Sequence, residues 1–144
     1  MKRSVFLFTL LFLIAGCGDQ APDGTVVNGP AAASTTVAGA GTVIYRALDF
    51  QALDDSGKPL PDIDIEFFSG GVGILTDLDG NALNPSNPGV YKTKTDDRGL
   101  GRVSLLATIP ACSGTVDEIF TASARGTVRS ADFLFTATIT LTCS

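Results

Sequence analysis

Hydrophobic and polar residues alternate along much of the chain after residue 42, a pattern that predicts β-strands. Leu48, Phe50 and Ala52 alternate with the polar Asp49 and Gln51, so the apolar residues share one face of a half-buried strand. Strands of this kind are predicted over residues 43–52, 62–67, 90–95, 100–108, 117–124 and 131–143. The chain is therefore expected to be an all-β protein.

The longest alternation lies at the end of the chain. Its inward positions are Phe133, Phe135, Ala137, Ile139, Leu141 and Cys143, and threonines occupy positions 136, 138, 140 and 142 between them. Between the predicted strands lie segments rich in Gly, Pro and Asp, which are typical of turns. A core made of aromatic and β-branched residues from several such strands is expected.

Three stretches together resemble a known family. They are Asp-Asp-Ser-Gly-Lys-Pro-Leu-Pro at 54–61, Thr-Lys-Thr-Asp-Asp-Arg-Gly at 93–99, and Phe-Thr-Ala-Ser-Ala at 120–124. With the closing strand, they make residues 48–142 similar to bacterial immunoglobulin-like domains of the invasin and intimin type. Carboxypeptidase-regulatory-like and transthyretin-like domains share the two turns. The resemblance implies an antiparallel immunoglobulin-like β-sandwich of about seven strands, expected over residues 42–144.

The N-terminus looks like a bacterial lipoprotein signal. Lys2 and Arg3 precede an apolar run that ends in Ile-Ala-Gly-Cys at 14–17. The resemblance implies removal of residues 1–16 and lipidation of Cys17, and Gly18 implies delivery to the outer membrane by the enterobacterial sorting pattern. An ordinary secretory signal and a retained membrane span are the alternatives, although the 15 uncharged residues 4–18 fall short of the roughly 20 that a span needs.

Residues 17–41 are predicted to be the lipidated cysteine and a flexible linker. They are rich in Gly, Ala, Ser, Thr and Pro and carry only two charges, Asp19 and Asp23. A flexible linker of this length has a root-mean-square reach of ~25 to 30 Å. A short strand near residues 35–38 is the alternative for its last part.

Composition excludes several classes of function. Once Lys2 and Arg3 are removed with the signal, eight basic and 15 acidic side chains remain, a formal net charge of −7. This negative charge is unfavourable for binding to nucleic acids and to anionic lipid headgroups. The absence of histidine removes the commonest general base and zinc ligand. We expect no enzyme and no cofactor.

Two cysteines remain after Cys17. In an exported chain, an even pair such as Cys112 and Cys143 is expected to form a disulfide. The alternative is a pair of buried free thiols.

The segment 69–90 is longer than a usual hairpin loop and is a candidate binding loop. Within it, Asp77, Asp79 and Asn81 place oxygen ligands at alternate positions, as in the first half of a calcium loop. The glycine is misplaced for such a loop and position 88 is proline, so an Asp-Gly turn is the favoured interpretation. Asp62, Asp64 and Glu66 alternate with isoleucines and are interpreted as the solvated side of a strand.

The sequence therefore predicts a non-catalytic, lipid-anchored protein of the outer membrane, on its periplasmic face or at the cell surface. Its immunoglobulin-like domain is expected to serve adhesion, interaction or structural roles with a protein or glycan partner. The alternative is a carbohydrate- or calcium-binding envelope module.

Overall fold

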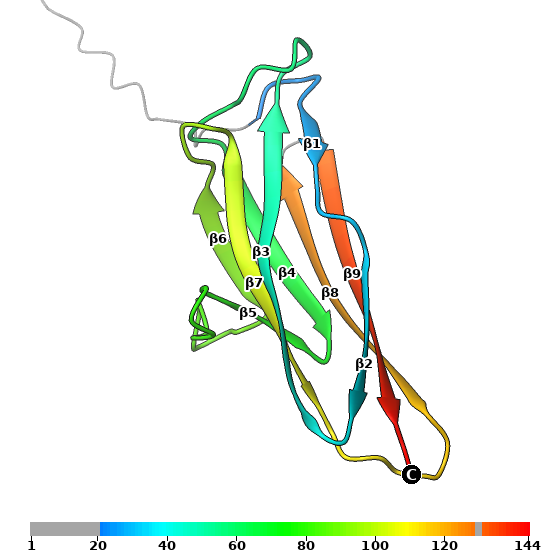
Figure 1. The fold of residues 1–144 in the computed structure, drawn as a ribbon. Coiled ribbons are helices and arrows are strands. Elements are labelled where there is room, and N and C mark those ends of the chain that lie inside the picture. The colour runs from blue at the N-terminus through cyan, green and yellow to red at the C-terminus, as the bar shows by residue number, and fades with distance from the viewer. Residues whose placement is uncertain (1–20, 129–130) are drawn as a thin grey trace, which may run out of the picture.

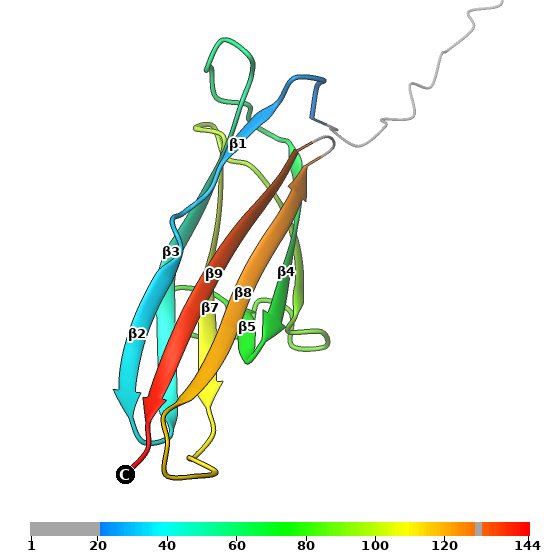
Figure 2. The ribbon, with the colours of Figure 1, turned by 90° about the vertical axis from the view of Figure 1, so that its right-hand side faces the viewer.

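The computed structural model describes residues 21–128 and 131–144, which form two β-sheets packed face to face (Figure 1, Figure 2). One sheet has the strand order β1 (Val26–Asn28), β3 (Gly41–Leu53), β7 (Leu100–Ile109), β5 (Gly73–Thr76). The other has the order β2 (Ala33–Ala38), β9 (Ala131–Thr142), β8 (Glu118–Val128), β4 (Asp64–Gly71), β6 (Val90–Lys94). The described residues thus form an all-β sandwich of nine strands, where about seven are predicted.

The inward faces predicted from the alternation meet between the two sheets. The six apolar positions 133–143 of the last strand are at most 9% exposed, and the predicted inward residues of β3 and β4 are buried as well. At the centre, the rings of Phe50 and Phe133 stack with centroids 3.9 Å apart. Phe67 meets Phe133 edge-on at 5.7 Å. Each such side chain contributes about 1.5 to 3 kcal/mol relative to an exposed one.

The chain changes sheets between β4 and β5. The N–H of Val72 donates to the Thr121 carbonyl in the five-stranded sheet, and the Val72 carbonyl accepts from Thr108 N–H in the four-stranded sheet, both at 3.3 Å. The preceding Gly71 has a φ of +66°, a backbone conformation that glycine adopts without strain. Gly71 and Val72 therefore form the corner that joins the two layers.

Two strands lie inside residues 17–41, so the prediction of a linker reaching residue 41 is wrong. β1 pairs antiparallel with the end of β3, while β2 runs parallel to β9, an exception to the expected antiparallel pairing. Ala21 is fully buried, so the folded unit includes residues well before 42. The strand β2 consists of small residues with little hydrophobic contrast, and pairing with β9 forms it. The alternative of a short strand near residues 35–38 is confirmed.

The sandwich is elongated, and its two ends carry different loops (Figure 1). At one end, β1 begins beside the 54–58 turn, because Val26 pairs with Leu53. At the other end lie the turn between β2 and β3, the 110–117 loop between β7 and β8, and the C-terminus (Figure 1). The start of β1 and the loop that contains Cys112 are therefore at opposite ends of the sandwich (Figure 1).

Candidate functional site

A disulfide joins Cys112 to Cys143, with an S–S distance of 2.03 Å and a Cα–Cα distance of 5.7 Å. The predicted pairing is confirmed, and the alternative of two free thiols is wrong. In the same loop, the Glu118 carboxylate accepts hydrogen bonds from the backbone N–H and hydroxyl of Ser113. The Asp117 carboxylate accepts from Cys143 N–H at 3.2 Å. The loop is therefore held by one covalent bond and by its own acidic side chains.

The proposed lipidation residue, Cys17, and the signal at 1–16 lie outside the described residues. From Ala21 to Val128 and from Ala131 onward, no helix is long and apolar enough to cross a membrane.

Three loops share the sequence Asp-x-x-Gly and one geometry; they span residues 54–58, 77–81 and 96–100. In each, the first Asp accepts two backbone N–H bonds through its Oδ1, both 2.9 Å, from the residues two and four positions later. Its own N–H donates to the carbonyl of the fifth residue at 2.9 Å. The glycine has a positive φ in every case. This is a type I turn closed by a glycine bulge, with the Asp side chain as its brace.

The calcium-like motif is the second of these turns. Oδ1 of Asp77 accepts from the N–H groups of Asp79 and Asn81, and its Oδ2 accepts from the Asn81 side-chain amide at 3.0 Å. Among the described residues, no group of three or more Asp, Glu or Cys side chains is placed to hold a metal ion. Asp77 and Asn81 therefore serve the turn, which supports the Asp-Gly interpretation, while calcium binding stays an untested hypothesis.

These turns make the stability of the fold dependent on pH. Hydrogen bonds to the carboxylate lower the pKa of Asp54, Asp77 and Asp96, led by the side chains of Ser56 and Asn81 and, for Asp96, by the Leu100 N–H. A lowered folded-state pKa means that the stabilisation is complete above the unfolded value of about 3.9 and is lost as the pH falls through the folded value. We expect the Tm to fall progressively below about pH 4.

Thermal unfolding followed by circular dichroism between pH 7 and pH 2 measures this dependence. The triple variant Asp54→Asn, Asp77→Asn, Asp96→Asn is the control, because its amides do not titrate and its curve should be flatter. An equally steep fall in the triple variant would assign the acid sensitivity to other carboxylates.

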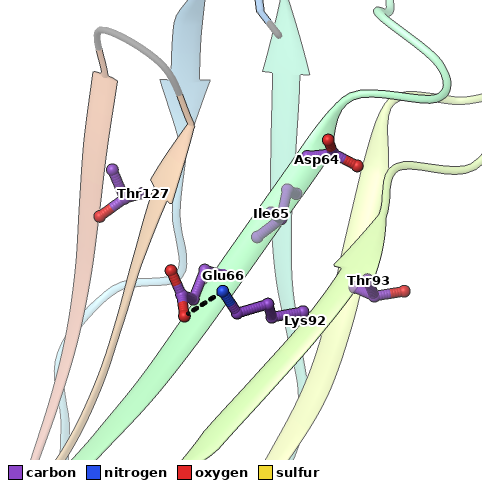
Figure 3. Close-up of a pocket in the computed structure, with 6 residues that line it drawn as sticks. All are labelled: Asp64, Ile65, Glu66, Lys92, Thr93 and Thr127. Carbon is purple, nitrogen blue, oxygen red and sulfur yellow. Dashed lines mark ion pairs between the residues drawn. The ribbon is translucent and has the colours of Figure 1, made fainter. Parts of the chain in front are cut away.

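The outer face of β4 and β6 carries the carboxylates that alternate with isoleucines. Figure 3 shows Lys92 reaching across to Glu66, with Nζ–Oε1 3.0 Å apart, beside a surface depression of about 350 Å³. Asp64 pairs with Lys94 at 3.4 Å. Asp64 and Glu66 are thus cross-strand ion-pair partners on the solvent side of the sheet, and Asp62, just before β4, is exposed, as expected for the solvated face of a strand.

A second depression was not signalled by the sequence. It lies beside β5 and β7, has a volume of about 180 Å³, and includes Thr76 and Ser104 in its lining. Both hydroxyl groups are buried and have no hydrogen-bond partner. In the sequence these two residues are ordinary strand positions, because only the pairing of β5 with β7 brings them opposite each other.

No protein-family model matches the chain, and no curated protein matches it in sequence.

Proposed function

We propose that the protein is a non-catalytic, lipid-anchored component of the bacterial outer membrane, built on an immunoglobulin-like domain that contacts a partner. The strand order supports the immunoglobulin assignment. β1-β3-β7-β5 follows the A-B-E-D order of an immunoglobulin sheet, and β9-β8-β4 follows the G-F-C order of its partner. One departure is that β5, in the place of strand D, precedes the edge strand β6 in the chain.

The signal-like run that ends in Ile-Ala-Gly-Cys at 14–17 carries the anchoring proposal, and the short distance along the chain from Cys17 to the fold indicates how a lipid would orient the domain. Only residues 18–20 separate Cys17 from the fully buried Ala21. Four residue steps span at most about 14 Å, less than the reach of a 24-residue linker. A lipid on Cys17 would therefore hold the 54–58 end of the sandwich close to the membrane.

The far end of the sandwich then projects away from the membrane. The loop at this end is fixed by the disulfide and exposes Val116, while Ile119 follows at the start of β8; these side chains are 72% and 70% exposed. Exposed apolar side chains on a rigid loop suit contact with another protein, because little conformational entropy is lost on binding. Adhesion, interaction or structural roles are all compatible with such a surface.

Lipid anchoring is tested by metabolic labelling of expressing cells with a radioactive or clickable fatty acid. The wild-type protein should carry the label and Cys17→Ala should lose it completely, because the diacylglycerol is attached through the Cys17 thiol and the freed amine is acylated only afterwards. The variant Cys112→Ala, Cys143→Ala is the matched control and should keep the label. A labelled Cys17→Ala, or an unlabelled wild type, would contradict the proposal.

Protease treatment of intact cells distinguishes adhesion from envelope assembly. A C-terminal tag marks the far end of the sandwich. Loss of the tag from intact cells would place the domain at the surface and favour adhesion. Protection that ends when the outer membrane is permeabilised would place it in the periplasm and favour envelope assembly.

The alternative function is a carbohydrate- or calcium-binding module. Segment 69–90 supports this alternative only in part, because both carboxylate oxygens of Asp77 already accept hydrogen bonds within the 77–81 turn. An unchanged Tm with and without a chelator would remove the calcium version.

A further inference from the structure

A half-open cavity of about 180 Å³ lies on the outer side of the four-stranded sheet, where the 77–83 segment folds back beside β5. Its lining includes the hydroxyl residues Thr76 and Ser104, the apolar Leu78 and Leu83, and the charged Asp77 and Arg102. The segment is held to β5 by the N–H of Leu83, which donates to the Leu75 carbonyl at 3.2 Å. The cavity is thus built from strands and a braced turn.

The lining of this cavity includes two residues with unsatisfied polar groups. Thr76 and Ser104 face each other across β5 and β7, both are 0% exposed, and neither hydroxyl has a hydrogen-bond partner. A buried hydroxyl without a partner destabilises a fold, whereas an alanine or valine at the same position would not. Two adjacent groups of this kind call for a hydrogen-bond partner, which a bound ligand would supply.

The backbone beside Ser104 is irregular as well. The pairing of β3 with β7 shifts between Tyr45 and Leu48, which face Leu105 and Val103, so the bulge lies opposite Ser104. Within it, Ala47 has a φ of +52°, a strained value for a residue with a Cβ. Bulges and strained residues are frequent beside functional sites. Strain and unsatisfied hydroxyls therefore coincide at one place.

The charged groups in the lining already have partners within the protein. Arg102 donates from Nε and Nη2 to the two oxygens of Asp49, at 2.5 and 2.8 Å. Both oxygens of Asp77 accept bonds from its own turn. Arg102 is thus occupied by Asp49, while Asp77 keeps its negative charge with both oxygens hydrogen-bonded, so the lining favours a neutral ligand over an anionic one.

We propose that this cavity binds one neutral sugar unit. The sugar hydroxyls would bond Thr76 and Ser104, and its C–H face would lie against Leu78 and Leu83. The volume is below the roughly 300 Å³ of pockets for drug-sized ligands, so a single ring fits better than a longer chain. Because both hydroxyls are closed to solvent, the proposal requires the sugar to displace part of the 77–83 segment on entry.

The test is a titration of the full-length, isotope-labelled protein with glucose, galactose, mannose and N-acetylglucosamine, followed by amide NMR shifts. We expect saturable shifts at Thr76, Leu83 and Ser104 with at least one sugar. The double variant Thr76→Val, Ser104→Ala should weaken binding at least tenfold. Thr127→Val, in the depression on the other sheet, is the matched control and should bind as the wild type does.

Stability of the double variant separates binding from folding. Removal of two unsatisfied hydroxyls should raise its Tm, so lost binding in a more stable protein cannot be ascribed to misfolding. No saturable shift with any of the four sugars would overturn the proposal, and so would unchanged binding by the double variant. Either result would mean that water alone supplies the hydrogen bonds of the Thr76 and Ser104 hydroxyls. Lipid anchoring is independent of both outcomes.

Discussion

Removal of the Cys112–Cys143 disulfide should lower the free energy of unfolding by roughly 3 to 4 kcal/mol. The two cysteines are 31 residues apart in the chain, and the bond closes this loop in the unfolded state as well as in the folded one. Loss of the bond therefore increases the entropy of the unfolded chain. The variant Cys112→Ala, Cys143→Ala, unfolded in urea and followed by circular dichroism, measures the effect.

Treatment with a reducing agent provides the control for this prediction. Reduced wild-type protein keeps both sulfur atoms, so its difference from the oxidised form isolates the cross-link from any loss of packing at Cys143, which is 9% exposed. The reductant should not change the double variant. An identical urea midpoint for oxidised and reduced wild type would show that the folded loop is strained enough to offset the entropic gain.

The strands that the sequence predicts correctly have strong contrast between their two faces. The last strand is the clearest, because large apolar residues alternate with threonines over its whole length. Three strands lie outside the six predicted ranges: β1 has only three residues, β2 was expected only as an alternative to the linker, and β5 was not assigned a range. β2 contains mostly small residues, so its faces differ little. β5 reads Gly-Ile-Leu-Thr, and because both Leu75 and Thr76 are buried, it shows no alternation that separates it from a loop.

The candidate site residues also differ in how far the sequence predicts their roles. The disulfide follows from counting cysteines in an exported chain, which needs no knowledge of the fold. The role of Asp77 follows from comparing it with Asp54 and Asp96, because all three begin the same turn. The hydroxyls of Thr76 and Ser104 were unpredictable, since whether a hydroxyl finds a partner depends on strand register and on what covers the sheet.

Replacement of Gly71 by alanine should destabilise the fold by roughly 2 to 5 kcal/mol, which combines a left-handed backbone conformation with overpacking. A Cβ at this position would lie 1.9 Å from the Thr121 carbonyl oxygen. That oxygen accepts the Val72 N–H bond at the corner between the sheets, so it cannot move away without breaking the bond. Urea-induced unfolding of Gly71→Ala measures the cost.

Gly39→Ala is the matched control for Gly71→Ala. Gly39 also has a positive φ, +86°, but a Cβ there would have no atom within 4 Å. It should therefore show only the conformational cost of about 1 to 2 kcal/mol. The difference between the two variants measures how rigidly β4, β5 and β8 are held at the corner. Equal effects would mean that the corner relaxes to make room for a Cβ. The close approach of the Thr121 carbonyl would then not be a reason for glycine at position 71.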